Sequence, residues 1–381
     1  MTTQAGDLLN LFQMPYGSDQ LQQPSLGQLP IHGPAMRNFP DIVGAIQTNC
    51  DISDARHAGD YTLCTYLLKM REYYRWENEL SYFLPVPQDD LGIWLTAREQ
   101  MWENMETIPL ASVPLKDGPA DPFDIDSINR DLVPRGYVYS AGYGRFNKPL
   151  FFLGRLLKQE QRQGFTILLS SCEYARELAA PPAMLRGRTI FARRESARRF
   201  VWEKIDEWRW QKRDNAMRRA LACYGFAENE CTLDRITDDA LRVMILHEIG
   251  EGLVGESLGD AWHSLMIGLA RSRAELIARA VRDHLADCRC TLPALLERND
   301  CASLHFYFAN LDGLRRELFL DLQSAYHHWV EDGDQRPLQG AVARGAEYWF
   351  NVAQSLIDTY KRDPERVRVS VEALLIEPQT H

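Results

Sequence analysis

The residues best suited to chemistry lie in the segment LHEIGE, which runs from Leu246 to Glu251. His247 and Glu251 stand four positions apart, so in a helix they share one face and can approach one ion. An imidazole nitrogen together with a carboxylate oxygen suits Zn²⁺, Fe²⁺ or Mn²⁺. Glu248 lies about 100° around the helix from His247 and is placed to exchange a proton rather than to bind the metal. The segment therefore predicts a metal site at His247 and Glu251, with Glu248 as the catalytic acid or base.

This segment departs from the H-E-x-x-H pattern of metallopeptidases, because Glu251 occupies the place of the second histidine. A site that draws carboxylates and histidines from several helices of a bundle fits better. The candidate partners on other predicted helices are Asp54, His57, Asp60, Glu203, Glu207, Asp260, His263, His284 and Asp287. A buried hydrogen-bonded network that orients the helices explains the same residues without a metal. The sequence leaves both interpretations open.

Four glycines follow closely in the same predicted helix, at Gly250, Gly252, Gly255 and Gly259. Each costs a helix about 1 kcal/mol relative to alanine. Close approach of another helix, or of a bound ligand, would offset that cost. The glycines therefore predict a tightly packed place in the structure.

A second candidate site is the basic segment 186–219, which holds twelve basic and five acidic residues. Arg193, Arg194, Arg198 and Arg199 cluster near the start of a predicted helix, and guanidinium groups bind phosphate or carboxylate in a bidentate manner. These arginines favour an alternative function, a non-catalytic binding or adaptor protein that presents a basic helix to an anionic partner. A charged helix whose glutamates pair with arginines four positions away explains the same segment without a partner.

Composition limits the classes of function. The 381 residues are 45% hydrophobic and carry a formal net charge of −10, which argues against general affinity for nucleic acid. No stretch approaches the roughly 18 apolar residues that cross a bilayer, so no membrane association is expected. The N-terminus lacks the features of a secretory signal, and the eight cysteines are therefore expected to be free thiols. We expect a soluble cytoplasmic protein, and the composition is compatible with an oligomer.

The elements that must position these residues are mostly helices. Long proline-free periodic stretches after Ala192 predict a mainly α protein, a multi-helix globular bundle with a small irregular or β insertion. The expected helices cover 51–82, 91–105, 193–224, 236–256, 260–287, 302–330 and 340–361, and short strands are expected at 137–139, 166–169 and 189–192. The alternating tail VRVSVEALLI predicts a late strand or a docked terminus.

These elements suggest four regions. Residues 1–38 are rich in Gln, Pro and Gly and predict a flexible N-terminal arm. N-terminal helices follow at 39–107. The Pro- and Gly-rich stretch 108–192 is the irregular or β insertion, and 193–381 is a C-terminal helical domain.

Four stretches of the chain together resemble an uncharacterised family of bacterial cytosolic proteins of about this length. They are CDISDARHAGDYTLCTYLLKMREYYRWE, AGYGRFNKPLFFLGRLL, LHEIGEGLVGESLGDAW and RAVRDHLADCRCTLPALLE. The resemblance covers most of the chain after residue 50 and implies a bacterial cytosolic protein. It implies no activity and no cofactor.

The function that these residues favour is a metal-dependent enzyme, hydrolytic or oxidative, with Zn, Fe or Mn as the cofactor. The alternative is the basic binding surface described above. The sequence specifies neither the substrate nor the identity of the metal.

Overall fold

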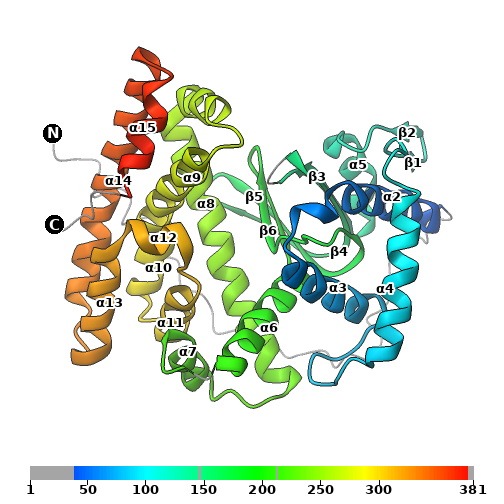
Figure 1. Cartoon of the computed structure of the whole chain (residues 1–381), viewed down its shortest axis with the longest axis horizontal. Helices are drawn as coiled ribbons and strands as arrows, with labels where there is room; N and C mark the ends of the chain where they lie inside the picture. The colour runs from blue at the N-terminus through cyan, green and yellow to red at the C-terminus, as the bar shows by residue number, and fades with distance from the viewer. Residues whose placement is uncertain (1–37, 145–146, 212, 376–381) are drawn as a thin grey trace. The chain divides into compact units, whose positions relative to one another are not determined.

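The computed structural model describes residues 38–144, 147–211 and 213–375. Helix is the majority class among these residues, and a five-stranded and a two-stranded sheet lie in the middle of the chain (Figure 1). The prediction of a mainly α protein with a β insertion is confirmed. The predicted flexible arm lies outside the described residues, except for Asn38.

The N-terminal helices are α2 (Phe39–His57), α3 (Leu63–Glu77) and α4 (Gln88–Glu103). Helix α2 has a proline in its first turn, where the missing N–H costs nothing. Helix α3 begins after Thr62, whose side-chain oxygen accepts a hydrogen bond from the backbone N–H of Thr65. The prediction of one helix over 51–82 is therefore wrong. A 3₁₀ turn (Ala58–Asp60) and the Thr62 cap divide that stretch into two helices.

Two antiparallel strands, β1 (Val113–Leu115) and β2 (Gly118–Ala120), and the short helix α5 (Ile125–Leu132) precede the main sheet. The strands of the main sheet are β3 (Tyr137–Tyr143), β4 (Pro149–Arg162), β5 (Phe165–Arg176), β6 (Ala183–Arg186) and β7 (Thr189–Arg193). Their order is β3-β4-β5-β7-β6, and only the β5–β7 pair is parallel. The three strands expected from the sequence lie within β3, β5 and β7.

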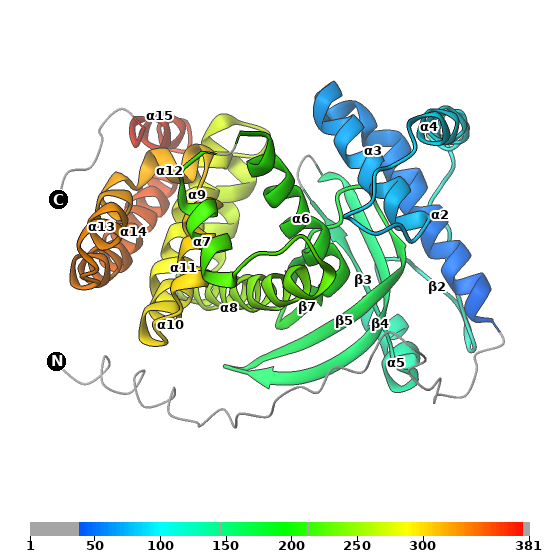
Figure 2. The ribbon, with the colours of Figure 1, turned by 90° about the horizontal axis from the view of Figure 1, so that it is seen from below.

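Helices cover both faces of this sheet, as Figure 2 shows. On one face, Ile42 and Ile46 of α2 pack with Phe151 and Leu153 of β4 in a continuous core. Beyond the other face lie α6 (Arg194–Gln211) and α8 (Glu230–Gly268). Side chains of α8 share a second core with residues of β5 and β7, namely Phe165, Ile167, Ile190, Ala192, Leu241, Ile245 and Ile249. Helix α8 is therefore fixed directly against the sheet.

Most of the other C-terminal helices pack around α8 and α9 (Arg273–Ala286) in the largest hydrophobic core of the described residues. A single π-helical turn (Asp287–Thr291) continues α9 and leads into α10 (Leu292–Glu297). The remaining helices are α7 (Ala216–Tyr224), α11 (Cys301–Ala309), α12 (Gly313–Leu318), α13 (Leu320–Asp332), α14 (Arg336–Arg362) and α15 (Arg366–Ala373). Nowhere in the described ranges does a helix combine the length and apolarity needed to cross a membrane.

Several expectations for this half of the chain need correction. The stretch 193–224 forms two helices, α6 and α7, and the stretch 302–330 is divided among α11, α12 and α13. The break expected at Gly259 is confirmed, because this residue adopts φ 66° and ψ −166°, outside the helical region, and two helical stretches of α8 meet there in a kink. The second stretch ends at Gly268 and α9 starts only at Arg273, so the single helix expected over 260–287 is wrong. The alternating tail forms helix α15 rather than a strand, because Val367 and Val371 stand one helical turn apart and are both buried.

Candidate metal centre

His247 and Glu251 lie one above the other on α8, as their spacing requires. The distance between Nε2 of His247 and Oε1 of Glu251 is 3.3 Å. Their side chains are partly exposed, at 23% and 17%. This place on α8 is therefore open to solvent and is not sealed within the core.

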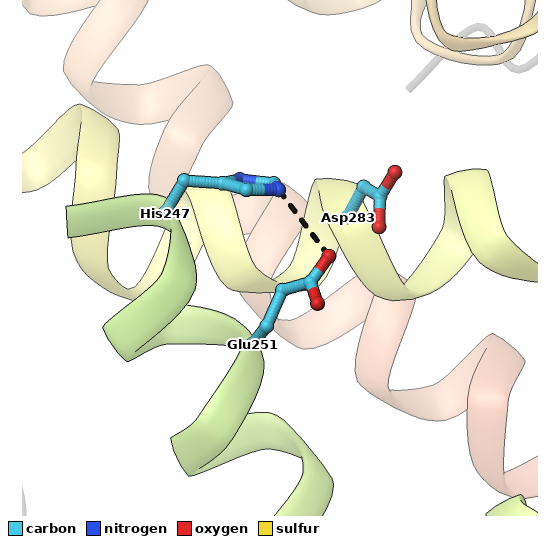
Figure 3. A group of neighbouring side chains, drawn as sticks. All are labelled: His247, Glu251 and Asp283. Atoms are coloured by element: carbon cyan, nitrogen blue, oxygen red, sulfur yellow. Dashed lines mark ion pairs between the residues drawn. The ribbon is translucent and has the colours of Figure 1, made fainter. Parts of the chain in front are cut away.

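Asp283 of α9 completes a three-residue group with them (Figure 3). One candidate ligand atom from each of His247, Glu251 and Asp283 lies within 4.8 Å of the other two. The side chain of Asp283 is also partly exposed, at 21%. One imidazole and two carboxylates on two neighbouring helices match the ligand types that Zn²⁺, Mn²⁺ and Fe²⁺ accept.

Asp287 fixes the orientation of the His247 ring. Its Oδ1 lies 2.7 Å from Nδ1 of His247, and its side chain is only 1% exposed. The hydroxyl of Tyr307 donates to Oδ2 of Asp287 at 2.8 Å, and the guanidinium of Arg315 donates to the same oxygen. Because the carboxylate accepts from Nδ1–H, Nε2 is the nitrogen that faces Glu251 and Asp283. Metal-binding histidines in proteins are commonly oriented in this way.

The charge of Asp287 is strongly stabilised. Burial alone would raise its pKa, but the positive charges of His247 and Arg315 and the hydrogen bonds to its oxygens outweigh burial. The pKa of Asp287 therefore lies well below its usual range. Burial would likewise lower the pKa of His247, but Asp287 and Glu251 outweigh it and raise that pKa well above its usual value. Without a metal, His247 is thus held as a cation between two carboxylates.

Close packing of α8 on the end of α9 brings these residues together. A Cβ atom at Gly250 would lie 2.7 Å from the carbonyl oxygen of Ala286, so only glycine permits this approach. A Cβ at Gly252 would lie 2.4 Å from the ring of Phe165 in β5. These two glycines pack α8 against another helix and against the sheet, as the sequence predicted. At Gly255, by contrast, an added Cβ would meet open space.

Arg282 is a competing partner for the same carboxylates. Its Nη2 lies 2.5 Å from Oε1 of Glu251 and 3.3 Å from Oδ1 of Asp283. Burial would raise the pKa of Glu251, but the hydrogen bond to His247 and the charge of Arg282 outweigh it and lower that pKa to about 2. The pKa of Asp283 is raised, mainly by burial and by the charge of Glu251. The group therefore also satisfies the metal-free alternative, a hydrogen-bonded ionic network.

Glu248 lies outside the three-residue group, as its position on the helix predicts. Burial and the negative charge of Glu251 raise its pKa to about 7. A carboxyl group with such a pKa exchanges protons near neutral pH. Because Glu248 is not one of the three candidate ligands, its carboxyl group is suited to proton transfer.

Of the partners anticipated on other helices, only Asp287 contacts His247. The neighbouring His284 is fully buried and stacks on Trp349 with ring centroids 5.0 Å apart. Asp54 pairs with Lys148 at 2.6 Å, and His57 pairs with Asp60 at 2.8 Å. Sequence reasoning missed Asp283. It stands four positions before Asp287, in the same spacing as His247 and Glu251, and that repetition was the available signal.

The four clustered arginines of the basic segment that were predicted to bind an anion all have partners within the chain. Arg193 bonds the buried carboxylates of Glu173 and Glu177, at 2.7 and 3.3 Å. Arg194 pairs with Asp238 at 2.6 Å. Arg198 pairs with Asp234 and Glu230 of α8. Arg199 pairs with Glu203 of α6 and donates to the backbone carbonyls of Ala179 and Ala180 in the loop after β5. The segment is thus engaged in holding α6 to its neighbours.

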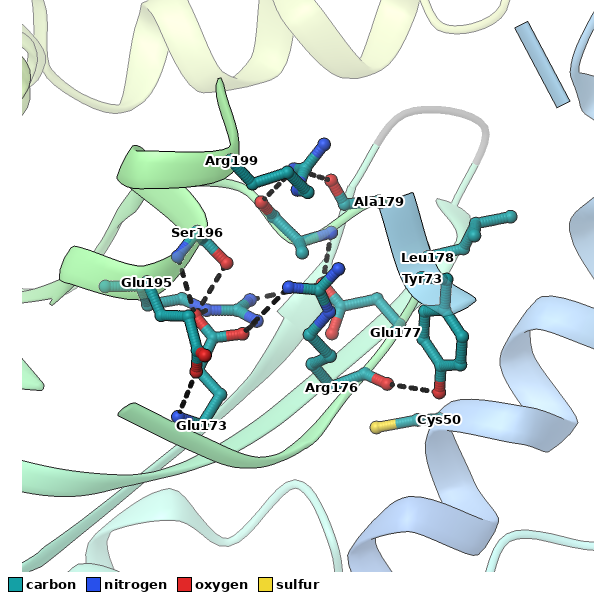
Figure 4. A network of polar contacts seen from close by, with 12 residues as sticks. Cys50, Tyr73, Glu173, Arg176, Glu177, Leu178, Ala179, Glu195, Ser196 and Arg199 are labelled. Atoms are coloured by element: carbon teal, nitrogen blue, oxygen red, sulfur yellow. Dashed lines mark hydrogen bonds and ion pairs between the residues drawn. The ribbon is translucent and has the colours of Figure 1, made fainter. Parts of the chain in front are cut away.

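The partners of Arg193 belong to a second cluster of charged groups, which sequence reasoning did not anticipate (Figure 4). The carboxylate of Glu173 accepts from Arg193 and from the hydroxyl of Ser196 at 2.6 Å. Oε2 of Glu195 accepts from the backbone N–H of Glu173, also at 2.6 Å. Arg176 is 1% exposed and lies over the ring of Trp76, 4.7 Å from its centroid. We call these residues the junction network, because they link β5 to the start of α6.

Comparison with known proteins identifies two family domains in the chain, which meet near the start of α6. The N-terminal domain of a family of unknown function (DUF6866) matches residues 41–193, and the C-terminal domain of the same family matches residues 198–378. The chain belongs to this family. Searches of curated proteins and of solved structures gave no match.

Proposed function

We propose that this protein binds one divalent transition metal ion at His247, Glu251 and Asp283 and uses it in a hydrolytic or oxidative reaction. The observation that carries the proposal is the orientation of His247. Its Nδ1 is committed to the buried Asp287, so Nε2 is left toward the carboxylates and lies 3.3 Å from Oε1 of Glu251. Three protein ligands at a partly exposed place leave room for a water or substrate in the remaining positions.

The surroundings supply what such an ion requires. Asp287 supports the imidazole from behind, and it is in turn held by Tyr307 and Arg315. Carboxylate partners of this kind raise the basicity of a ligating histidine. Arg282 would keep its contact with Asp283 or Glu251 beside the ion, where it neutralises part of the negative charge. Metal binding requires His247 to lose its proton, because only neutral imidazole ligates.

Glu248 is the proposed acid or base. It stands one residue from a proposed ligand but belongs to a different face of α8, so it would remain free to exchange a proton rather than bind the metal. The bound metal would supply Lewis acidity or redox chemistry. The role of Glu248 would be to accept or donate the proton of the reacting group.

The alternative function, an anion-binding basic helix, requires guanidinium groups that are free to meet a partner. Arg193, Arg194, Arg198 and Arg199 each have acceptors within the chain. The metal centre is therefore the function that the geometry supports best.

Metal uptake by the full chain tests the proposal. Protein purified without chelator is titrated with Zn²⁺, Mn²⁺ and, under anaerobic conditions, Fe²⁺, and bound metal is measured by mass spectrometry and calorimetry. We expect about one ion per chain for at least one of these metals, and a higher melting temperature when it is bound. Wild-type protein that takes up none of the three would overturn the proposal.

Variants separate the ligands from the other roles. His247→Ala and Asp283→Asn are expected to lose the ion, whereas Glu248→Gln should retain it and lose turnover against a panel of ester, phosphoester and peptide substrates. The matched control is His263→Ala, which removes an exposed histidine from the same helix. Equal metal loss in the control would show that binding is not at this site.

A further inference from the structure

A second candidate site lies between α3 and α4, on elements other than those that carry the proposed metal ligands. A surface cavity with a volume of about 440 Å³ opens there. The residues around it come from α2, the 3₁₀ turn, α3 and α4, and from the segment just after α4. They are Ala55, Ala58, Tyr61, Leu63, Tyr66, Glu99, Trp102, Glu103 and Glu106.

The two walls of this cavity differ in chemistry. Leu63 and Tyr66 line the cavity, and Leu67 lies next to them on the same face of α3, by the spacing of three and four residues. Leu63 and Leu67 are 71% and 45% exposed, which is unusual for leucine side chains placed side by side on a helix. This wall therefore presents apolar and aromatic surface to solvent.

The opposite wall is acidic. Glu99, Glu103 and Glu106 follow one another at spacings of four and three residues, so they form one stripe along the end of α4 and the turn that follows. Tyr66 reaches across the cavity and donates a hydrogen bond to Glu99 at 3.1 Å. Within the described part of the chain, the carboxylates of Glu103 and Glu106 have no hydrogen-bond or ion-pair partner. Their charges are available to a ligand.

Among the described residues, the cations near the cavity form no ion pair with the acidic stripe. Arg56 donates at 2.8 Å to the backbone carbonyl of Glu106, and it does not reach a carboxylate of the stripe. The ring of Tyr61 already faces Lys69 and Lys148, at 5.6 and 5.4 Å from its centroid. None of the residues that line the cavity is basic. The surface therefore combines exposed apolar area with uncompensated negative charge.

From this complementarity we propose that the groove between α3 and α4 docks a basic, leucine-rich segment of a partner protein. Its aliphatic side chains would pack on Leu63, Tyr66 and Leu67, and a lysine or arginine would reach Glu103 and Glu106. The floor of the groove is Trp102, which is 3% exposed and donates its indole N–H to Asp51 at 3.2 Å. An anionic membrane surface is disfavoured as the occupant, because the acidic stripe would repel its headgroups.

Synthetic peptides test this docking surface on the full chain. The probe is a fluorescent, amidated peptide that alternates leucine and arginine, and its matched control replaces each arginine by citrulline, which has the same shape without charge. At low salt we expect the arginine peptide to bind at least about tenfold more tightly than the citrulline peptide, with an affinity that falls as salt is added. Equal affinity for both peptides, or no binding of the arginine peptide, would overturn the proposal.

Two sets of variants and the NMR signal of one tryptophan test where the peptide binds. Glu103→Gln combined with Glu106→Gln should weaken the arginine peptide about tenfold without changing the melting temperature, because both side chains are exposed and unpaired. Glu331→Gln, an exposed acid on α13, is the control and should change nothing. With ¹⁵N-labelled tryptophan, the indole signal of Trp102, assigned with Trp102→Phe, should shift on binding. Binding that leaves this signal in place, or that free agmatine matches in affinity, would count against a docked segment.

Discussion

Two groups of charged residues in this molecule contain similar side chains but are built differently. In the junction network, Arg193 and Glu173 have side chains that are 3% and 0% exposed, and each has several partners. At the candidate metal centre, the side chains of His247 and Glu251 are partly exposed. One ring nitrogen of His247 and carboxylate oxygens of Glu251 and Asp283 lie close enough together to bind one cation. Buried charges that are fully paired with one another hold structural elements together. Partly exposed ligand atoms that point toward one common position remain available to bind an ion.

The comparison predicts that the two groups respond differently to the loss of one member. In the junction network the main consequence should be unfolding, because a charge is left buried without a partner. At the metal centre the main consequence should be the loss of a ligand, with a smaller effect on stability. The predictions below run from the largest expected effect to the smallest.

The largest effect is expected from Arg193→Met. The change removes the cation that neutralises Glu173 and Glu177, both of which are fully enclosed. Breaking a buried pair from one side typically costs about 3–5 kcal/mol. Denaturant unfolding of the full chain should show a loss of this size. A loss below about 1 kcal/mol would mean that the junction network does not hold β5 to α6.

The second effect concerns Asp287→Asn at the metal centre. Asparagine keeps the shape of the side chain but removes the charge that orients and supports His247. Mutation of such a supporting carboxylate typically lowers metal affinity by about 10–100-fold. Calorimetric titration with the metal that the wild type binds measures the change.

Tyr307→Phe is the control for that experiment. It removes a single hydrogen bond to the other oxygen of Asp287 and leaves its contact with His247 unchanged. We expect a smaller loss of affinity than for Asp287→Asn. If both variants bind the metal as tightly as the wild type, Asp287 has no part in positioning the ligand.

How much of the candidate metal site could be predicted from the sequence depends on whether its residues lie on one helix or on two. The spacing of His247 and Glu251 fixed their common face, because a helix of 3.6 residues per turn leaves no other arrangement. Asp283 lies on another helix, and its place depends on how closely α8 approaches Ala286 at Gly250. No local sequence pattern predicts tertiary packing of that kind. Of the two alternatives for the alternating tail, the docked terminus is confirmed and the strand is wrong, since burial of Val367 and Val371 against other helices outweighed the strand-like pattern.

The pairing of α6 with α8 was not predicted, although a signal for it was present in the sequence. Arg194 and Arg198 stand four residues apart, and so do their partners Asp234 and Asp238. Two complementary stripes with equal spacing indicate a pair of helices side by side. By contrast, nothing in the local sequence distinguishes Arg193 from Arg194, because its burial follows from its place at the end of β7.

The third prediction uses pH to separate the members of the junction network. Burial and the charge of Glu173 raise the pKa of Glu195 from 4.5 to about 7 in the folded protein. The folded state therefore binds this proton more tightly than the unfolded state. Its contribution to stability is fully present below the ordinary pKa and is lost as pH rises through about 7.

Glu195→Gln stays neutral at every pH and should not lose this contribution. The stability of the variant relative to the wild type is therefore expected to rise by about 1–3 kcal/mol between pH 5 and pH 8, since one unit of pKa corresponds to ~1.4 kcal/mol. The pKa of Glu173 is about 2, because Arg193 and its hydrogen bonds outweigh burial, so that group does not titrate in this window. A constant difference between variant and wild type over this range would contradict the assignment.

The smallest effect is expected from Arg194→Gln, one residue from the position where the largest is expected. Arg194 is 26% exposed and its partner Asp238 is 58% exposed, so water already solvates both charges. Exposed pairs of this kind contribute about 0–1 kcal/mol, and added salt screens them. Unfolding at low and high salt should show a loss below about 1 kcal/mol that shrinks as salt is added. A loss comparable to that of Arg193→Met, or one that salt does not change, would show that burial does not separate these two arginines. Exposure to water would then not explain why buried charged pairs stabilise the fold more than partly exposed ones.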